Sequence, residues 1–178
     1  MKEINTKDWN HFNITDFLDN ITVRIKLGNK HISDNGTIPV YSSSTERNGL
    51  FGYTESNATF IVDEDNPYYI IFGDHTKSMF LIKHSFCVMD NVKVLKPNKY
   101  DELFLLFLLT SWRKSIPDLG YARHWSEAKT SVFKLPVNSN GEPDYDYMHT
   151  FMEKKLAENT SKLNSYLSAV NNLHSNEL

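Results

Sequence analysis

The sequence lacks the features that would place it outside the cytoplasm or across a membrane. Cys87 is its one cysteine, so no disulfide can form within the chain. Its longest apolar run, residues 103–109, is far shorter than the roughly 20 residues that a membrane-spanning helix needs. The first residues also carry no apolar stretch typical of a secretory signal. We therefore expect a soluble, cytoplasmic protein with no membrane partner.

Common sequence signatures of enzymes are missing too. No Gly-Lys-Ser/Thr loop or Gly-x-Gly-x-x-Gly turn offers a seat for a nucleotide, and no Gly-x-Ser-x-Gly turn presents a nucleophilic serine. The histidines and the lone cysteine do not have the spacing of a zinc site. These absences predict a protein with no cofactor, no metal and no catalytic residues.

What is present is the composition of one globular domain with an extension: 178 residues, 40% apolar and 23% charged. An apolar segment with acids at its start and bases at its end predicts a buried helix over residues 101–114. Short β-branched and aromatic runs broken by Gly, Asn, Asp and Pro predict strands at residues 22–25, 38–41, 58–62, 68–72, 79–82, 86–89 and 92–95. The expected fold class is α+β, with mostly antiparallel strands, a buried helix and a long C-terminal coiled-coil helix.

The C-terminal segment has the clearest periodicity in the chain. After an Asn-, Gly- and Pro-rich linker at residues 137–143, spacings of alternately three and four residues predict a heptad seam on a long helix. The seam consists of His149, Met152, Leu156, Asn159, Leu163, Tyr166, Val170 and Leu173. We predict one domain over residues 1–143 and, over residues 144–178, a helix that dimerises or docks a partner subunit. The alternative is a terminal helix folded back on its own domain.

The charges are unevenly distributed, although the net charge is −3. Residues 67–136 carry ten basic and six acidic side chains, whereas the segments on either side are both net negative. A basic middle segment is compatible with a face that contacts DNA, and it also occurs in ordinary enzymes.

A polar loop at residues 42–49 follows the apolar segment 38–41. It contains four hydroxyl residues, an arginine and an asparagine, and it ends on a glycine. Arginine and asparagine can bind the edges of guanine and adenine through two hydrogen bonds, and hydroxyl groups can bind phosphates. The loop therefore predicts a surface that reads bases, with a solvated turn between two strands as the alternative.

A weak nuclease pattern provides an enzymatic alternative. Asp118 follows a proline, and Glu127 and Lys129 form the Glu-x-Lys of many metal-dependent nucleases. In that chemistry two carboxylates hold a cation, and the lysine, on a strand inside a sheet, positions a water molecule. The residues before Glu127 match a buried strand poorly, so we do not favour this interpretation.

Three blocks together resemble one family, the target recognition domains of type I restriction-modification specificity subunits. They lie in order across most of the chain: residues 38–44 (IPVYSSS) with 48–53 (NGLFGY); 71–76 (IFGDHT) with Phe86 and 92–95 (VKVL); and 121–124 (YARH) with 134–137 (KLPV), 141–144 (GEPD) and Met148. Each block is weak alone, and their order and spacing make the combination specific.

The resemblance implies a non-catalytic module that reads double-stranded DNA. In that family the specificity subunit directs DNA adenine methyltransferase subunits and a restriction subunit to a split target. This chain departs from the usual plan of two recognition domains and two helices, which suggests either a half-size subunit that forms a homodimer or a fragment of a longer protein. A protein-interaction adaptor that pairs without binding DNA is the third alternative.

The resemblance also suggests which side chains contact DNA. The candidates lie in three loops and, in the case of Tyr53, shortly after the first loop: Ser42, Ser43, Ser44, Thr45, Arg47, Asn48, Tyr53, His75, Thr76, Lys77, Arg123 and His124. Each could instead take part in local packing. The predicted dimer or partner interface consists of Met152, Leu156, Asn159, Leu163, Tyr166 and Val170.

Overall fold

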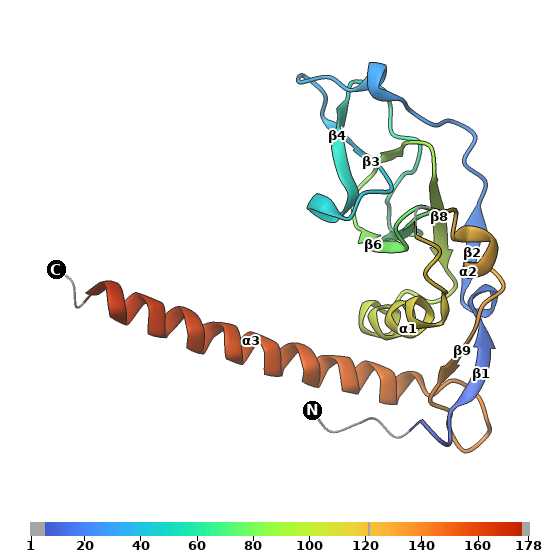
Figure 1. Cartoon of the computed structure of the whole chain (residues 1–178), viewed down its shortest axis with the longest axis vertical. Coiled ribbons are helices and arrows are strands. Elements are labelled where there is room, and N and C mark those ends of the chain that lie inside the picture. Colours follow the sequence, from blue (N-terminus) through green and yellow to red (C-terminus); the bar gives the residue numbers. More distant parts are fainter. Residues whose placement is uncertain (1–5, 121, 176–178) are drawn as a thin grey trace. The chain divides into compact units, whose positions relative to one another are not determined.

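The computed structural model describes residues 6–120 and 122–175, with side chains as far as Asn171. Its strands (Figure 1) are β1 (Asn10–Asn13), β2 (Leu18–Ile21), β3 (Ile38–Tyr41), β4 (Leu50–Thr54), β5 (Tyr69–Gly73), β6 (Ser78–Ile82), β7 (Cys87–Val88), β8 (Val92–Pro97) and β9 (Val132–Leu135). Its helices are α1 (Glu102–Ser115), α2 (Trp125–Ala128) and α3 (Tyr145–Ser175), with short 3-10 helices η1 (Ile14–Asp16), η2 (Asn29–His31) and η3 (Glu46–Gly49). The predicted α+β class, with mostly antiparallel strands and a long C-terminal helix, is confirmed.

Contacts between residues group the chain into two compact units. The sheet unit comprises His11–Tyr100 and Leu109–Lys134, and the helix unit comprises the residues up to Asn10, Asp101–Leu108 and the residues from Leu135 onward. The division passes through α1. The predicted functional boundary between residues 143 and 144 is a different kind of division and stays a prediction.

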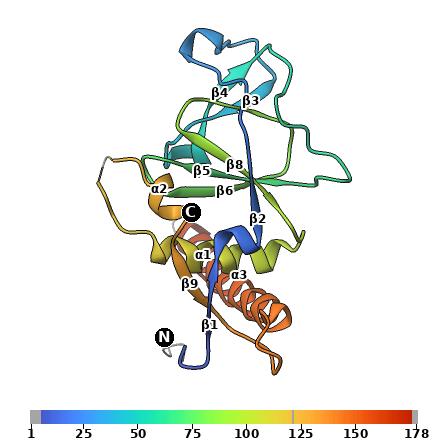
Figure 2. The same cartoon turned by 90° about the vertical axis from the view of Figure 1, so that its right-hand side faces the viewer.

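The sheet unit is built on two sheets (Figure 2). Four antiparallel strands in the order β2-β8-β5-β6 form the larger sheet, and three strands in the order β4-β3-β7 form the smaller one. Within the smaller sheet β3 and β4 are antiparallel, whereas β3 and β7 are parallel, with Val40 opposite Cys87. β1 pairs separately with β9.

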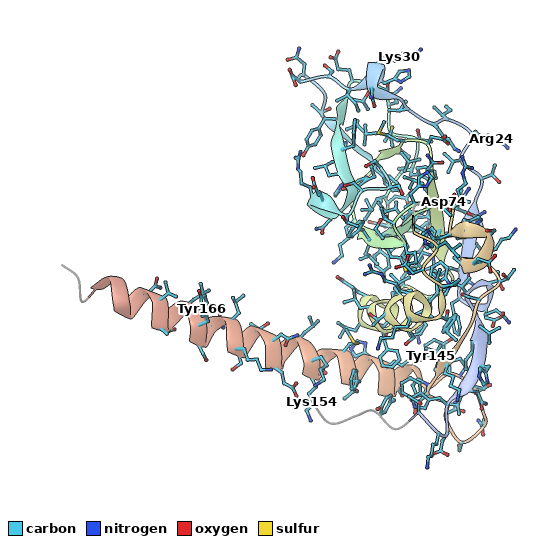
Figure 3. The ribbon with its side chains drawn as sticks, viewed as in Figure 1. Arg24, Lys30, Asp74, Tyr145, Lys154 and Tyr166 are labelled. Atoms are coloured by element: carbon cyan, nitrogen blue, oxygen red, sulfur yellow. The ribbon has the colours of Figure 1, made fainter. Side chains whose placement is uncertain are left out.

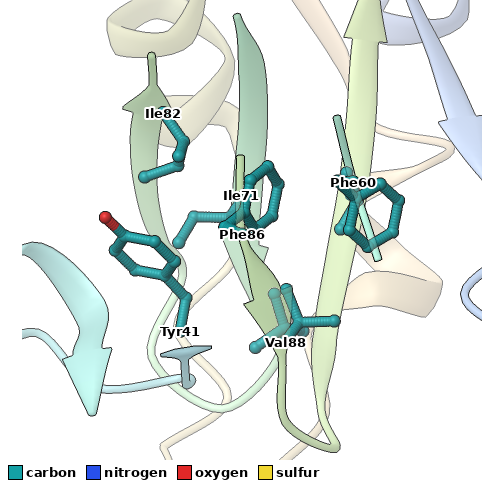
Figure 4. Close-up of a cluster of buried hydrophobic side chains, with 8 residues drawn as sticks. Tyr41, Phe60, Ile71, Ile82, Phe86 and Val88 are labelled. Carbon is teal, nitrogen blue, oxygen red and sulfur yellow. The ribbon is translucent and has the colours of Figure 1, made fainter. Parts of the chain in front are cut away.

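A cluster of buried side chains joins the two sheets of this unit (Figure 4). Tyr41 from β3 packs edge-on against Phe86, with ring centroids 5.8 Å apart, and Phe60 stacks on Phe86 at 5.0 Å. Ile71 from β5 and Val88 from β7 complete the contact and are 1% exposed or less. Burying a large apolar side chain contributes about 1.5 to 3 kcal/mol, so this core fixes the strands from which the loops emerge.

Two predicted strands differ from the structure. Strand β2 lies at Leu18–Ile21 instead of residues 22–25, because Leu18 is the residue that pairs with Pro97 of β8 and becomes buried. The segment 58–62 makes just one bridge, between Phe60 and Phe86. Its backbone N–H groups at residues 59 and 60 both donate to the carbonyl of Phe86, so no ladder continues.

Helix α1 confirms the predicted buried helix. Asp101 precedes it, and its carboxylate accepts the backbone N–H of Phe104 at 3.0 Å, as an N-cap does. Within the sheet unit, Trp112 is fully buried against Phe72, and its indole N–H donates to the carbonyl of Ala128 at 2.9 Å. No described helix is both long and apolar enough to cross a membrane.

The helix unit is formed around the first turns of α3. Met148 is fully buried, and Tyr145 packs edge-on against Phe104, with ring centroids 4.8 Å apart. His149 lies on the predicted seam, yet its Nδ1 is 3.0 Å from both carboxylate oxygens of Asp101. The beginning of α3 is therefore occupied by contacts within its own unit, which agrees with the alternative interpretation for these turns.

Candidate nucleic-acid interface

The first loop of the sheet unit has an unusual backbone. Arg47, Asn48 and Gly49 have φ angles of 48°, 54° and 82°, three consecutive residues in the left-handed region. The loop is closed by the N–H of Ser42, which donates to the carbonyl of Gly49 at 2.8 Å. A left-handed conformation costs a non-glycine residue about 1 to 2 kcal/mol, so the surrounding contacts determine this shape. It leaves the side chains of Arg47 and Asn48 exposed.

Ser43 connects the first loop to the second, which follows β5. Its hydroxyl accepts the backbone N–H of His75 at 3.0 Å, and its carbonyl accepts the hydroxyl of Thr76 at 2.8 Å. A Cβ on Gly73 would collide with the hydroxyl oxygens of Ser78, Thr76 and Ser43, so a side chain there would separate the loops. The two predicted loops thus form one hydrogen-bonded layer.

Asp74, whose position is labelled in Figure 3, connects the second loop to the third through hydrogen bonds. It is 2% exposed, and its carboxylate accepts the N–H of Trp125 at 2.7 Å. Its carbonyl accepts both the backbone N–H and the ring Nδ1–H of His124, at 2.8 and 3.0 Å, while its own N–H donates to Asn91. Sequence reasoning placed Asp74 in the second loop without recognising this role, since a partner about 50 residues away leaves no local signal.

His124 is a poor candidate for a DNA contact. It is 1% exposed, and both ring nitrogens are used, because Nε2 accepts the N–H of Leu119 at 3.2 Å while Nδ1 donates to Asp74. We therefore assign His124 to holding the third loop in place and omit it from the proposed contacts.

Two hollows open beside these loops, each of about 580 Å³. The first, which we call the Arg47 hollow, is lined by Leu27, Gly28, Ser42, Ser43, Ser44, Glu46, Arg47, Leu50, Phe51, Met89, Asp90 and Asn91. It mixes donors with acceptors. The hydrogen bond from Lys26, at 2.8 Å, lowers the pKa of Asp90 and keeps this carboxylate an acceptor. Base edges also present donors and acceptors together, so this lining suits base reading.

The second, the Lys77 hollow, is lined by His75, Thr76, Lys77, Thr110, Arg113, Lys114, Asp118, Gly120 and His124. Arg113 and Lys114 are exposed cations at the end of α1. Sequence reasoning assigned them to the helix macrodipole and missed their position beside the second loop. The N–H of Gly120, followed by the charge of Lys77, lowers the pKa of Asp118, so its carboxylate is ionised within this basic lining.

Some of the predicted contact residues line neither of these two hollows. Thr45 and Asn48 are exposed on the first loop without lining either one, and Tyr53 stands on β4 with 42% of its surface exposed. Arg123 is exposed on the third loop, while its neighbour Tyr121 lies outside the described residues. The structure thus brings together Ser42, Ser43, Ser44 and Arg47 at one hollow and His75, Thr76 and Lys77 at the other.

The nuclease pattern does not form its expected geometry. Glu127 lies in α2 and Lys129 directly follows it, so neither occupies a strand inside a sheet. Asp118 is bound to the N–H of Gly120 at 3.0 Å and lies 3.8 Å from Lys77. Among the described residues, no three His, Cys, Asp or Glu side chains are placed to hold a metal together.

The predicted interface on α3 is apolar and exposed after the first turns. Leu156, Leu163 and Tyr166 are 44%, 56% and 65% exposed, and Leu167 beside them is 47% exposed. Of the other predicted members, Asn159 is exposed, while Met152 and Val170 are half-buried. Leu173 has no described side chain. Exposed apolar residues at heptad spacing are typical of a helix that pairs with another helix.

Comparison with known proteins gives consistent results. The sequence model of the family described as the type I restriction modification DNA specificity domain matches residues 6–164. A specificity subunit of a type II restriction enzyme from Heyndrickxia coagulans, S.BcgI, is 25% identical over 170 residues, which cover 91% of this chain and 48% of that protein. The chain thus spans about half the length of this curated relative.

Solved structures share the fold at low sequence identity. The S subunit of a type I restriction-modification system from M. genitalium matches with a TM-score of 0.60 at 18% identity, over 94% of this chain and 43% of that one. The HsdS subunit from Thermoanaerobacter tengcongensis matches with a TM-score of 0.57 at 9% identity, over 90% of this chain and 40% of that one.

Proposed function

Because the chain belongs to the family of type I restriction-modification DNA specificity domains, we propose that it reads a DNA sequence on behalf of partner subunits that modify or cut the DNA. Those partners are adenine methyltransferase subunits and a restriction subunit. The chain itself recognises its target and leaves the covalent chemistry to them.

The observation that carries this proposal is the layer of three loops. Hydrogen bonds through Ser43 and Asp74 hold the loops together, and two hollows adjoin them, one with a mixed polar and apolar lining and one with a basic lining. A protein that reads DNA needs groups that bind phosphates to position it and groups that bind base edges to discriminate. We assign phosphate binding to the Lys77 hollow and base reading to the Arg47 hollow.

A second copy of the chain is the partner we propose for the exposed face of α3. The heptad spacing of Leu156 and Leu163 allows two identical helices to interlock, and Asn159 on the same face would select the register. A two-fold dimer carries two identical reading surfaces, so its target would contain two copies of one short element in inverted orientation.

Selection of bound duplexes from a random pool tests the proposal. The purified chain should enrich one short sequence element, and inverted pairs of that element should dominate once the protein is dimeric. Adenine methylation mapped in a host that carries this gene with its methyltransferase partner should fall within the same element. Binding that enriches no sequence would contradict the proposed function.

Arg47→Ala should weaken discrimination at one base position of the selected element. The guanidinium can donate two hydrogen bonds to a guanine, and losing such a pair costs about 1 to 3 kcal/mol. Affinities for the element and its single-base variants, measured by fluorescence anisotropy, would reveal the position. Arg24→Ala, an exposed arginine outside both hollows, is the matched control. An equal loss of affinity for every variant sequence would show that Arg47 binds phosphate instead.

A further inference from the structure

In the part of the chain that the structure describes, the Lys77 hollow is lined by one carboxylate, Asp118, and several basic side chains. Lys77 has a side chain that is 16% exposed, and its ammonium group lies 3.8 Å from Asp118 and 3.5 Å from the carbonyl of Ile116. The Asp118 side chain is 80% exposed, so its carboxylate meets Lys77 from the solvent side. Arg113 and Lys114 line the same hollow.

We propose that the Lys77 hollow binds a backbone phosphate of the DNA. In the free protein Asp118 forms an ion pair with Lys77, and this pair breaks when the phosphate enters. This inference rests on the proposed function and extends it to one site and one pair of residues.

The chemistry of the lining favours a phosphodiester. An anionic group with several acceptor oxygens matches the donors of Lys77, Arg113 and Lys114, and arginine binds phosphate oxygens through two parallel bonds. A base edge would also need acceptors, and among the described residues Asp118 is the one acidic side chain that lines this hollow. The hollow and the Arg47 hollow both adjoin the layer held by Ser43, which contacts His75 and Thr76.

Asp118 is suited to a reversible contact. Its other carboxylate oxygen is fixed by the N–H of Gly120, so the group faces Lys77 without being buried. Exposed ion pairs are weak, and a phosphate entering beside a fixed carboxylate is repelled by it. Asp118 therefore lowers the affinity for any DNA without affecting the choice of base.

Removing the charge of Asp118 and removing the charge of Lys77 should change the affinity for DNA in opposite directions. Asp118→Asn should tighten binding about twofold to fivefold, equally for the selected element and for a scrambled duplex. Lys77→Asn should weaken binding to both duplexes about threefold to tenfold and reduce the slope of log K against log salt by about 1. Asparagine is chosen because it tolerates the left-handed backbone of Lys77, whose φ is 52°.

Controls separate this site from general charge effects and from misfolding. Glu127→Gln removes an exposed negative charge outside the hollow and is the control for Asp118→Asn. Lys129→Asn removes an exposed positive charge outside the hollow and is the control for Lys77→Asn. Both controls should leave the affinity for DNA unchanged. Lys114→Ala, on an exposed position of α1, should reproduce the salt effect of Lys77→Asn without touching the second loop.

The outcomes distinguish this inference from the proposed function. If the unmutated protein enriches no sequence, the proposed function fails. If it enriches a sequence but Asp118→Asn binds DNA no more tightly than Glu127→Gln, or if Asp118→Asn changes the preferred base, the inference is overturned. Tighter binding with an unchanged base preference supports it.

Discussion

Leu156→Asp combined with Leu163→Asp should leave the protein monomeric at concentrations at which the unmutated chain forms a dimer. In a two-fold pair, each chain would place two carboxylates in the apolar seam of the other, where they lose hydration and repel one another. Both leucines are roughly half exposed in the single chain, so the substitutions cost its own fold little. Sedimentation equilibrium and unfolding curves would measure the two effects separately.

Ser161→Asp with Ser168→Asp is the matched control for this prediction. Both serines are exposed on α3, seven residues apart like the two leucines, and they lie on the side of the helix opposite the seam. This pair adds the same charge and should leave the dimer intact. An unmutated chain that sediments as a monomer at micromolar concentration would rule out the homodimer itself.

Asp74→Ala should reduce discrimination between the selected element and a scrambled duplex while salt-sensitive binding remains. The carboxylate is the acceptor for the N–H of Trp125, and without it this partly buried donor loses its partner. Leaving such a group unsatisfied costs about 1 to 3 kcal/mol of folding free energy. The third loop would keep its two bonds from His124 to the Asp74 carbonyl and lose the one from Trp125. Its position relative to the second loop would become less well defined, so base contacts would suffer more than phosphate contacts.

Asp74→Asn keeps an oxygen at the same position and should retain most of the discrimination. Asp65→Ala removes an exposed carboxylate in the same unit and should change neither property. Denaturant unfolding and competition binding would be measured on all three variants. If Asp74→Ala loses stability but discriminates as well as the unmutated protein, the third loop takes no part in reading bases.

The sequence predicted the elements better than the contacts between them. Strand β5 could be located because its apolar run ends at Gly73, and helix α1 because its apolar run has an acid at its start and bases at its end. The segment around Phe60 has the same composition as a strand, yet its N–H groups converge on one carbonyl. Composition indicates which residues are buried. It does not indicate which acceptors their backbone N–H groups bind.

The sequence predicted the candidate site as three separate loops. It did not predict the hydrogen bonds that connect these loops. Ser43 meets His75 and Thr76 across more than 30 residues, and Asp74 meets Trp125 across 51. Such contacts depend on the register between strands and on where a helix lies in space. A local sequence pattern encodes neither of these. The same reason explains His149, which its spacing placed on the predicted seam and whose ring contacts Asp101 on another segment.

The backbone of residues 47–49 restricts how this protein could acquire a new target. Asparagine, aspartate and glycine enter the left-handed region at low cost, whereas β-branched side chains are strongly disfavoured there. Substitutions at positions 47 and 48 are therefore restricted: asparagine, aspartate and glycine fit this backbone at the lowest cost, and β-branched residues fit it worst. Ser44 and Thr45 have no such restriction on φ, so changes of specificity should accumulate at these positions first.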